Sequence, residues 1–535
     1  GSTDRNPTHE YTEVGTYPVT LQAYNAGGYN ASTVVDYITV SDTPVPPAAA
    51  FSGTPTSGLA PLTVSFTDAS TGDPTGWVWF FGDETYDEAW TEQTDDAGWT
   101  ARMYPASVAL PDGSIVFMGG RSDTDYLNDA WRSTDNGTTW TRQTEHAGWT
   151  ARFKHASVAL PDGSIVLMGG SDSSRQPLND VWRSTDNGTT WTEVNASAGW
   201  AARTLHTSTV LSDGSIVLMG GYDSLDQSLN DVWRSTDAGA TWTEMNASAG
   251  WAVRYQHSSV ALPDGKIVLM GGSDDTTRYN DVWQSTDSGA TWTCVNASAG
   301  WPARASHTSV ALPDGSIVLA GGLDGDIDQQ NDVWRSADGG ATWTRLPDAG
   351  WSARNGHTSV ALPDGSIVLI GGSDASWALL NDVWRLQPAG SSGQSPSHTY
   401  TAPGTYSVTL QAYNAGGYNA STAVDYITVS APPVANFTAN VTAGIVPLAV
   451  QFTDTSANSP TTWAWAFGDG ATSTDQNPVH TYASAGTYTV SLTAGNVVGT
   501  DTLSQIGYVT VTVLPPAAAF SGTPTSGAAP LTVGF

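Results

Sequence analysis

The chain of 535 residues has few basic side chains and almost no cysteine. Two lysines and 17 arginines stand against 51 acidic residues, which gives a formal net charge of −32. Binding to a nucleic-acid backbone requires a basic surface, so the composition excludes nucleic acid as a partner. An acidic surface instead keeps an extracellular protein soluble.

A lone cysteine, Cys294, excludes a disulfide framework and a multi-cysteine metal site. It occupies the position of Glu193 and Glu244 in sibling repeats, which favours an exposed surface position.

No apolar run reaches spanning length and no signal peptide heads the chain, so we expect no membrane span in this segment. Long helical periodicity is also missing. Short alternating apolar runs bounded by Gly, Asn, Asp and Pro predict an all-β protein.

What the chain does have is one unit of 50 or 51 residues, repeated six times between Trp90 and Trp384. Its core reads A-R-x-x-H-x-S-V-A-L-P-D-G-S-I-V-L-M-G-G, then a variable stretch, then N-D-V-W-R-S-T-D-x-G-x-T-W-T. The P-D-G and T-D-x-G segments supply the turns of two hairpins. A four-stranded unit repeated at this period is typical of a β-propeller blade.

Two family resemblances meet in this unit. The G-G pair with the downstream N-D-V-W resembles kelch repeats, and S-T-D-x-G-x-T-W resembles the Asp-box of sialidase-type propellers, in which the aspartate caps its own turn. After Trp384 the sixth repeat has no Asp-box and no outer strand. We expect residues 88–92 to supply that strand beside Asn381–Arg385 and to close a six-bladed ring.

A second repeat family lies outside the propeller. Residues 435–513 carry W-x-W-x-F-G-D-G at Trp463–Gly470 and resemble a PKD domain, an immunoglobulin-like β-sandwich common on archaeal and bacterial surface proteins. Another copy is split, with the propeller inserted between its halves. Residues 9–41 nearly repeat residues 398–430, and residues 515–535 nearly repeat residues 46–66, so each corresponds to half a sandwich.

The sequence therefore predicts a six-bladed propeller inserted into a PKD-like sandwich, with further PKD-like sandwiches in tandem. The predicted domains are residues 1–42 (second half of a sandwich), 46–83 plus 391–430 (the split sandwich), 84–390 (the propeller), 431–513 (a complete sandwich) and 514–535 (first half of a sandwich).

The resemblance implies a secreted, modular cell-surface protein most like those of methanogenic archaea. We predict a non-enzymatic, extracellular structural or adhesive protein of a surface layer, sheath or filament. The sandwiches would be stalk or assembly modules and the propeller a displayed head. The expected partners are neighbouring copies, joined head to tail through half-sandwiches, and glycans or other surface proteins. The alternative is a carbohydrate- or protein-binding propeller, and a sialidase-like or other glycosidase is the third hypothesis.

Catalysis needs an asymmetric set of groups, whereas the blades are near-copies, so we predict no enzyme and no catalytic residue. The repeated arginines are Arg102, Arg152, Arg203, Arg254, Arg304 and Arg354, and the repeated histidines are His155, His206, His257, His307 and His357. Ligands on a six-fold ring lie too far apart to bind one ion. We interpret both sets as hydrogen-bonding groups repeated between blades.

Variation between blades is concentrated in the loop between G-G and N-D, and such loops usually carry recognition. The candidate binding residues are Tyr126, Tyr222, Arg278, Tyr279 and Trp377. The alternative is a tolerant surface.

Two further features suggest sites on surface loops. Asp324, Asp326 and Asp328 alternate as in a calcium loop but lack the distal bidentate glutamate. The alternative is an acidic surface loop, and no other cofactor is expected. The N-x-S/T candidates for glycosylation are Asn30, Asn136, Asn187, Asn195, Asn246, Asn296, Asn419, Asn436 and Asn440.

Overall fold

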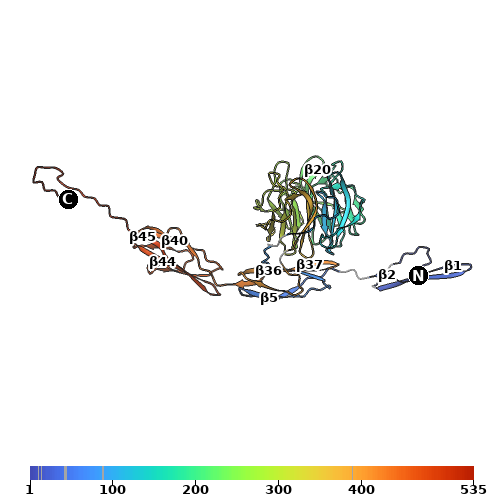
Figure 1. Cartoon of the computed structure of the whole chain (residues 1–535), viewed down its shortest axis with the longest axis horizontal. Coiled ribbons are helices and arrows are strands. Elements are labelled where there is room, and N and C mark those ends of the chain that lie inside the picture. The colour runs from blue at the N-terminus through green and yellow to red at the C-terminus, as the bar shows by residue number, and fades with distance from the viewer. Residues whose placement is uncertain (10, 12, 14, 41–44, 87–89, 388–389) are drawn as a thin grey trace. The chain divides into compact units, whose positions relative to one another are not determined.

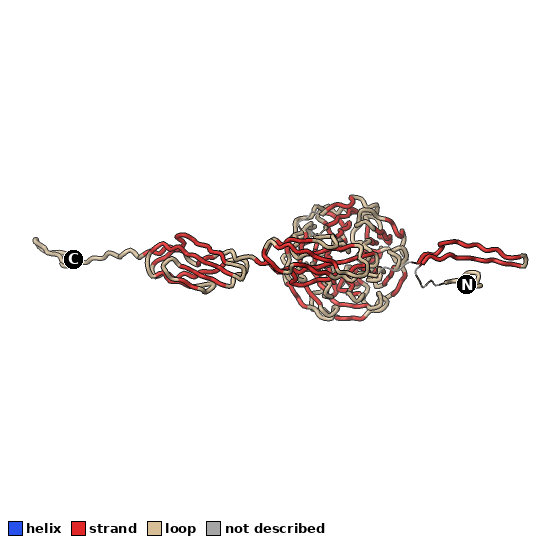
Figure 2. The backbone as a smooth tube through the Cα atoms, turned by 90° about the horizontal axis from the view of Figure 1, so that it is seen from below, coloured by secondary structure: helices blue, strands red, loops and turns tan. Residues whose placement is uncertain are grey.

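The structure is a computed structural model and describes every residue except 10, 12, 14, 41–44, 87–89 and 388–389. The described residues form strands, turns and loops, with no helix among them (Figures 1 and 2). Within this part of the chain no helix is therefore available to cross a membrane. The chain divides into two compact units. One comprises Gly1–Gly53, Ser65–Ser397 and Ser407–Val424, and the other Thr54–Val64, His398–Tyr406 and Asp425–Phe535.

Six antiparallel sheets form the blades of a propeller in the first unit. The first blade contains β8 (Ala106–Ala109), β9 (Ile115–Arg121), β10 (Tyr126–Ser133) and β11 (Thr141–Thr144). The second contains β13 (Ala156–Ala159), β14 (Ile165–Met168), β16 (Val181–Ser184) and β17 (Thr192–Asn195). The third contains β19 (Thr207–Val210), β20 (Ile216–Asp223), β21 (Ser228–Ser235) and β22 (Thr243–Asn246). The fourth blade contains β23 (Ser258–Ala261), β24 (Ile267–Met270), β25 (Val282–Ser285) and β26 (Thr293–Asn296). The fifth contains β27 (Thr308–Ala311), β28 (Ile317–Ala320), β29 (Val333–Ser336) and β30 (Thr344–Arg345). The sixth contains β32 (Thr358–Ala361), β33 (Ile367–Asp374), β34 (Leu379–Leu386) and β7 (Thr91–Thr94). Short strands flank the channel mouth at β12 (Arg152–Phe153), β15 (Ser171–Asp172), β18 (Arg203–Thr204) and β31 (Arg354–Asn355).

The sixth blade takes its outer strand from the start of the propeller, as the sequence predicted. β7 pairs antiparallel with β34, and Trp384 lies opposite Glu92. The sixth and first blades also touch, because Ser107 Oγ lies 2.7 Å from Thr358 Oγ1. Residues 88 and 89 of the predicted strand lie outside the described residues. Closure of the ring leaves no long exposed sheet edge between blades.

Each blade is held by apolar side chains and by a pair of tryptophans. In the second blade Ile165–Met168 is fully buried. Trp149, from the A-G-W segment, packs edge to face against the outer Trp191 with ring centroids 6.0 Å apart. Because every blade repeats this arrangement, the apolar core forms a continuous ring. Burial of apolar surface stabilises it by about 25 cal/mol per Å².

The Asp-box turns have the structural role that the resemblance implies. Asp186 accepts hydrogen bonds from the Thr190 N–H at 2.8 Å and from the Thr190 hydroxyl at 2.6 Å. Ser184 Oγ accepts from the Gly188 N–H at 2.9 Å, and the Trp191 indole donates to the Gly188 carbonyl at 3.1 Å. Each of these aspartates therefore fixes its own turn and the outer tryptophan.

The split sandwich is assembled from segments on both sides of the propeller, so the propeller is an insertion. Its strands are β3 (Phe51–Thr54), β4 (Ser57–Leu59), β5 (Leu62–Asp68), β6 (Gly76–Phe80), β35 (Ser397–Tyr400), β36 (Gly404–Asn414) and β37 (Gly417–Ser430), in sheets of order β3-β5-β35 and β4-β37-β36-β6. Strand β6 pairs with β36, and Trp79 lies opposite Leu410. The Trp79 indole donates to the Gly393 carbonyl at 2.9 Å.

The second sandwich is continuous in sequence and lies in the second unit. Its strands are β38 (Phe437–Ala439), β39 (Ala443–Ile445), β40 (Leu448–Asp454), β41 (Thr462–Ala466), β42 (Thr472–Ser473), β43 (Val479–Tyr482), β44 (Gly486–Gly495) and β45 (Thr500–Thr512). Trp465 and Phe467 are buried in its core. The Trp463 indole donates to Asp454 at 2.8 Å, as the Trp77 indole does to Asp68 at 2.9 Å in the split copy. The shared motif therefore builds the same core contact twice.

The two remaining fragments form little structure of their own. Strands β1 (Gly15–Asn25) and β2 (Gly28–Val40) make a two-stranded ribbon. Residues 515–535 contain one isolated bridge, between Thr523 and Gly534.

Candidate functional site

The guanidinium groups of the repeated arginines bind partners within their own blades, so the interblade contact predicted for the arginines is not made by their side chains. Arg203 is fully buried, and its guanidinium binds Asp231 with two hydrogen bonds of 2.7 Å and the Gly220 carbonyl at 2.9 Å. Its own N–H donates to the Leu178 carbonyl of the preceding blade at 3.0 Å. The Trp233 indole donates to the same aspartate at 2.7 Å. Equivalent pairs are Arg102–Asp129, Arg152–Asp180, Arg254–Asp281, Arg304–Asp332 and Arg354–Asp382.

In three of the repeats the ion pair lowers the pKa of the aspartate. Burial alone would raise the pKa of Asp231, but the hydrogen bonds and positive charge of Arg203 lower it below its usual value. Asp180 and Asp332 have lowered pKa values for the same reasons. The repeated Arg and Asp positions are therefore occupied by each other and offer no free group to a ligand.

The repeated histidines are buried between blades. Nε2 lies 2.9, 2.8 and 3.2 Å from a hydroxyl of the preceding blade in the pairs His257–Thr207, His307–Ser258 and His357–Thr308. Burial, followed by the charge of a neighbouring arginine, lowers the pKa to about 3 for His155, His206, His307 and His357. The ring nitrogens of His155 and His206 have no hydrogen-bond partner among the described residues. The interblade hydrogen bond predicted for every histidine therefore forms at three of the five.

The residue before each histidine position forms part of a closed ring around the channel. Each backbone N–H donates to the carbonyl of the equivalent residue in the preceding repeat, at 2.8–3.2 Å. The members are Tyr104, Lys154, Leu205, Gln256, Ser306 and Gly356. All six have φ between 50° and 59°, which is unusual for residues other than glycine. Backbone conformations of this kind persist when their surroundings enforce them, and they cluster at functional sites.

This ring surrounds a cavity of 130 Å³ at one end of the channel. Tyr104 extends across it, because its hydroxyl lies 3.1 Å from Ser306 Oγ and accepts from Gln256 Nε2 at 2.9 Å. Burial raises the pKa of the Tyr104 hydroxyl. The six side chains all differ, unlike the arginines and aspartates of the same repeats. Sequence reasoning missed them, although the x-x of R-x-x-H was a variable pair inside an invariant frame.

The predicted loops begin beside this channel mouth. Arg121 and Met103 exchange backbone hydrogen bonds of 3.0 Å, and Arg121 pairs with Tyr126 across the loop. Tyr126 packs edge to face against Phe153 with centroids 5.1 Å apart. In the third repeat, Tyr222 packs against Tyr255 at 5.2 Å. Tyr126 and Tyr222 thus lie next to residues that immediately precede the axial ring.

The other predicted binding residues are partly committed to neighbours. The Tyr279 hydroxyl donates to Asp274 at 2.5 Å, and its ring lies 4.3 Å from the Arg254 guanidinium carbon. Arg278 donates to the backbone carbonyl of Asp324. Trp377 is 54% exposed and offers the largest free aromatic surface of the five. Their role in binding stays a prediction.

The predicted calcium loop uses its first aspartate to fix its own turn. Asp324 Oδ1 accepts from the N–H groups of Asp326 and Asp328 at 3.0 Å each, and Oδ2 accepts from Gln330 at 2.9 Å. Among the described residues, no three His, Cys, Asp or Glu side chains are grouped to hold a metal ion. Asp374 makes the same turn contacts in the sixth repeat. Calcium binding stays a prediction.

The repeated N-A-S motif has a structural explanation. The Asn195 amide donates to the Ala240 carbonyl of the next blade at 2.8 Å, and its oxygen accepts from the Ser197 N–H at 2.9 Å. Asn246 and Asn296 make the same interblade contact. The exposed sequon asparagines are Asn30, Asn419, Asn436 and Asn440, and the half-buried ones are Asn136, Asn187, Asn195, Asn246 and Asn296. Glycosylation stays a prediction at all nine. The exposed Cys294 lies on the outer strand β26, as expected.

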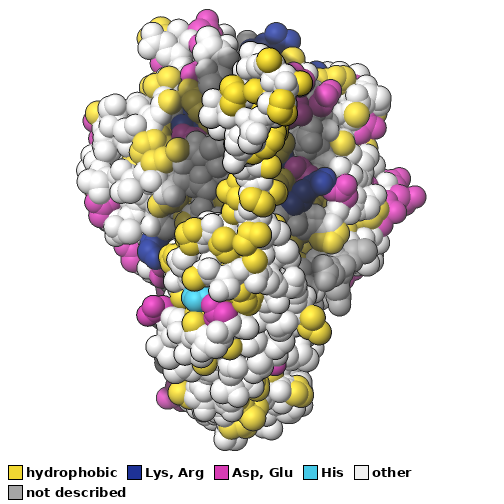
Figure 3. Space-filling model, turned by 90° about the vertical axis from the view of Figure 1, so that its left-hand side faces the viewer, with side chains coloured by type: hydrophobic (Ala, Val, Ile, Leu, Met, Phe, Trp, Pro, Cys, Tyr) yellow, Lys and Arg dark blue, Asp and Glu magenta, His cyan; other side chains and the backbone are white. Residues whose placement is uncertain are grey.

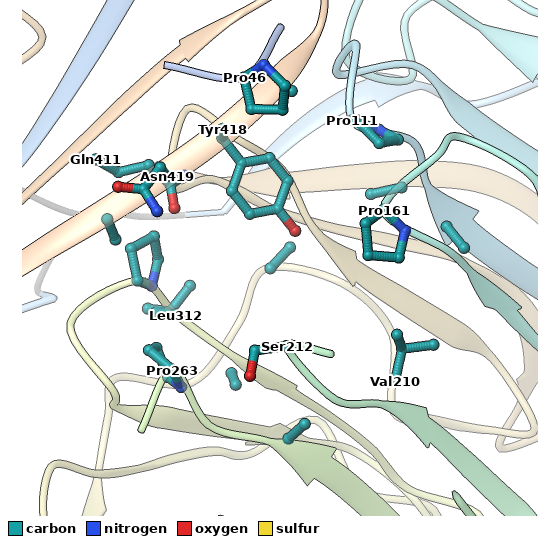
Figure 4. Close-up of a pocket in the computed structure, with 18 of the residues that line it drawn as sticks. Pro46, Pro111, Pro161, Val210, Ser212, Pro263, Leu312, Gln411, Tyr418 and Asn419 are labelled. Carbon is teal, nitrogen blue, oxygen red and sulfur yellow. The ribbon is translucent and has the colours of Figure 1, made fainter. Parts of the chain in front are cut away.

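A second cavity, of 460 Å³, lies at the opposite end of the propeller, under the hairpin of β36 and β37. Its propeller walls come from the Ala-Leu-Pro turns of successive repeats, including Pro111, Pro161 and Pro263. Tyr418 projects into this cavity (Figure 4), and about half of its surface is accessible. Partial burial in the cavity raises the pKa of the Tyr418 hydroxyl. Gln411 donates to the Pro363 carbonyl at 2.5 Å. The hairpin therefore caps this end of the channel.

Comparison with known proteins identifies both kinds of module. A family model described as the KLHDC2/KLHL20/DRC7 Kelch-repeats domain matches residues 105–322 and 206–403. These matches together cover more than half of the chain, which therefore belongs to the Kelch-repeat family. A PKD domain model matches residues 387–429 and 430–511. PKD domains are typical of extracellular proteins.

The curated relatives are similar over single modules. The chain is 41% identical over 66 residues to collagenase ColA of Bacillus cereus, which is 12% of this chain and 7% of the collagenase. It is 32% identical over 81 residues to tRNA wybutosine-synthesizing protein 4 of Saccharomyces cerevisiae, which is 15% of this chain and 11% of that protein. The chain is also similar to the solved structure of YjhT, with 14% sequence identity and a TM-score of 0.45. The matched region covers 62% of this chain and 99% of the YjhT chain.

Proposed function

We propose that this protein is a non-enzymatic extracellular adhesive or binding protein of a cell surface. The propeller is the recognition head, and the PKD-like sandwiches are the modules that carry and assemble it. The surface layer, sheath or filament of a methanogen-like archaeon, implied by the resemblance, belongs to the same proposal.

One observation carries this function: the repeats differ from one another mainly around one end of the channel. The arginine, aspartate, histidine and tryptophan positions repeat from blade to blade. Their side chains make the repeated contacts that hold the propeller together, and we call these positions the frame. The axial ring and the adjoining loops hold different side chains in every repeat. A rigid scaffold that presents variable side chains on one face is the usual arrangement of a binding protein. The ring supports binding over catalysis, since the Tyr104 hydroxyl is already engaged by hydrogen bonds with Gln256 and Ser306.

The test is to screen the full chain against glycan and surface-protein arrays and then to measure binding by variants. We expect Trp377→Ala and Tyr222→Ala to weaken the main interaction several-fold. Tyr24→Ala is the matched control, because Tyr24 is an 82% exposed aromatic residue on the β1–β2 ribbon. Absence of any ligand, or an equal loss in Tyr24→Ala, would contradict a recognition role for this face.

Assembly into a polymer is a second candidate, favoured by the duplicated half-sandwiches. Leu21 is 68% exposed, whereas the equivalent Leu410 is fully buried in the split sandwich. Since residues 46–66 and 398–430 belong to one sandwich, residues 515–535 of one copy are the matching occupant for residues 9–41 of another.

Light scattering coupled to size exclusion tests the assembly. We expect concentration-dependent oligomers that disappear on deletion of residues 515–535. A control deletion of residues 1–8, which precede the duplicated segment, leaves them unchanged. Equal oligomer content with and without residues 515–535 would exclude this mode of assembly.

A further inference from the structure

Unpaired positive charge is concentrated at the channel mouth. Fourteen of the 19 basic side chains form an ion pair with an acidic residue that the structure describes. The other five are Arg5, Arg121, Lys154, Arg175 and Arg278. All except Arg5 belong to the axial ring or to the loops beside it. A chain of net charge −32 therefore leaves its spare cations on one face of the propeller. On the face drawn in Figure 3, by contrast, acidic side chains are widely scattered and basic ones are few.

Three of these cations lie close together across the first two repeats. Arg121 exchanges backbone hydrogen bonds with Met103, next to Tyr104 in the sequence. The Lys154 N–H donates to the Tyr104 carbonyl at 3.2 Å. Arg175 lies on the loop after β15, which pairs with β12. Burial, and then the charges of Arg121 and Arg175, lower the pKa of Lys154 to about 8. Lys154 therefore lies in the positive field of Arg121 and Arg175, and no acidic residue that the structure describes forms an ion pair with any of the three.

Two acidic side chains of the same loops, Asp172 and Asp125, accept hydrogen bonds from groups other than these cations. Asp172 Oδ1 accepts from the N–H groups of Ser174 and Gln176 at 2.9 and 2.8 Å. Asp125 accepts from the Thr124 hydroxyl at 2.7 Å. These carboxylates fix their turns and form no ion pair with the three cations. A half-buried, unpaired cation costs free energy that an incoming anion can recover.

Aromatic rings lie beside this positive charge. Lys154 Nζ is 4.8 Å from the Phe153 ring centroid and 5.5 Å from that of Tyr104. Tyr126 packs on the edge of Phe153. Aromatic rings beside a few charged groups suit a small ring-shaped ligand that carries one anionic group. Tyr104 and Lys154 also line the 130 Å³ cavity at this end of the channel.

We propose that the channel mouth binds an acidic glycan, whose carboxylate or sulfate group is held by Arg121, Lys154 and Arg175. This inference rests on the proposed binding function and names its ligand class. Guanidinium groups bind such oxyanions with two parallel hydrogen bonds, and lysine adds a point charge. A nucleic-acid backbone would require a far longer basic track than three side chains.

The experiment is isothermal titration calorimetry with the full chain. The probes are pentagalacturonate for a carboxylate, a sulfated galactan pentamer for a sulfate, a neutral galactan pentamer and pentaglutamate. We expect one or both acidic glycans to bind, and their affinity to fall as salt rises. Lys154→Met is expected to weaken this binding on the order of tenfold. Lys266→Met is the matched control, since it removes the other lysine, which pairs with Asp264 on an exposed turn, and binding should stay within about twofold.

Arg175→Gln provides a second test on an exposed loop, should Lys154→Met fail to fold. Unchanged acidic-glycan binding in the folded variant overturns the site. Equal binding of the neutral pentamer, or equally tight binding of pentaglutamate, overturns the ligand class while the face remains a binding surface. If neither these probes nor the arrays yield a ligand for this face, the proposed function fails as well.

Discussion

The two ends of the propeller channel are built by the same six repeats from different kinds of side chain. At the end under the sandwich hairpin, the repeats present nearly the same Ala-Leu-Pro turn, and Tyr418 projects among them. At the other end, equivalent positions hold Tyr104, Lys154, Leu205, Gln256, Ser306 and Gly356. The backbone is regular at both ends. The axial ring of hydrogen bonds is complete at the variable end, and at the other end the leucine N–H of each turn donates to a carbonyl four residues later at 2.8–2.9 Å.

The difference shows that the frame and the recognition surface occupy separate positions in each repeat. The frame uses buried ion pairs, tryptophans and capped turns, so one side chain there has several obligatory partners. At the variable end, backbone hydrogen bonds close the ring, so side chains other than Tyr104, Ser306 and Gln256 are available for other contacts. Substitutions in the frame should therefore cost stability, and substitutions at the variable end should cost binding.

The largest effect is expected from breaking one ion pair of the frame. Arg203→Met leaves Asp231 buried without its partner, and we expect a loss of about 3–5 kcal/mol in the free energy of unfolding of the propeller. Chemical denaturation followed by tryptophan fluorescence measures it. The double variant Arg203→Met, Asp231→Leu should recover part of the loss. Arg175→Met, which removes an unpaired cation, should change stability by less than about 0.5 kcal/mol. Equal losses in the two single variants would contradict the separation of roles.

The next effect is acid sensitivity of the propeller. His155, His206, His307 and His357 have pKa values of about 3, below the unfolded value of 6.5. Below pH 6.5 the unfolded chain therefore binds protons that the folded propeller does not, and stability falls progressively between pH 6.5 and 3. The loss is on the order of 1–2 kcal/mol per histidine at pH 5.

Scanning calorimetry of the full chain between pH 7 and pH 4 measures this difference. The propeller transition should move to lower temperature more steeply than that of residues 431–513, which contain a single histidine, His480. Parallel shifts of both transitions would show that buried neutral histidines do not dominate the acid response.

A smaller effect is expected at the variable end itself. Tyr104→Phe removes the hydroxyl that contacts Ser306 and Gln256, while the backbone ring stays intact. We expect a loss of about 1 kcal/mol in the free energy of unfolding. Thermal denaturation checks it, with Tyr126→Phe as the control, since the described contacts of Tyr126 involve its ring. A loss as large as that of Arg203→Met would place Tyr104 within the frame.

The smallest stability effect is expected at Lys154, together with a distinct titration. Nuclear magnetic resonance of the chain with ¹³C-methylated lysines should show the Lys154 signal titrating near pH 8. The groups that act on it are Arg121 and Arg175, beside the rings of Phe153 and Tyr104. Lys154→Met should raise stability by less than about 1 kcal/mol, because it removes an unpaired, half-buried charge. A loss of stability would show that the ammonium group has a structural partner.

Repeats made the architecture readable from the sequence, and variation inside repeats located only part of the candidate site. In the loops, whole segments differ between the repeats, and this variation predicted Tyr126 and Tyr222 as binding residues. The same argument did not predict Lys154 and Tyr104. One or two variable residues after a repeated arginine look like an ordinary surface position that tolerates substitution. The turns around Asp324 and the contacts of Asn195 were read as ligand and glycan positions, and the structure gives each a backbone contact as well.

The duplicated hairpins separate what the sequence by itself determined from what the tertiary structure decided. Alternation of apolar residues and the N-A-G-G turn determine an antiparallel hairpin in both copies, at β1–β2 and at β36–β37, since these are local properties of the chain. Burial is not local. Leu410 is buried in the split sandwich, where β36 pairs with β6, whereas Leu21 has no such neighbour among the described residues. In the same way, composition determined that cations are scarce. Only the closing of six repeats around one axis placed Arg121, Lys154 and Arg175 on adjacent segments, with no ion pair to an acidic residue among those described.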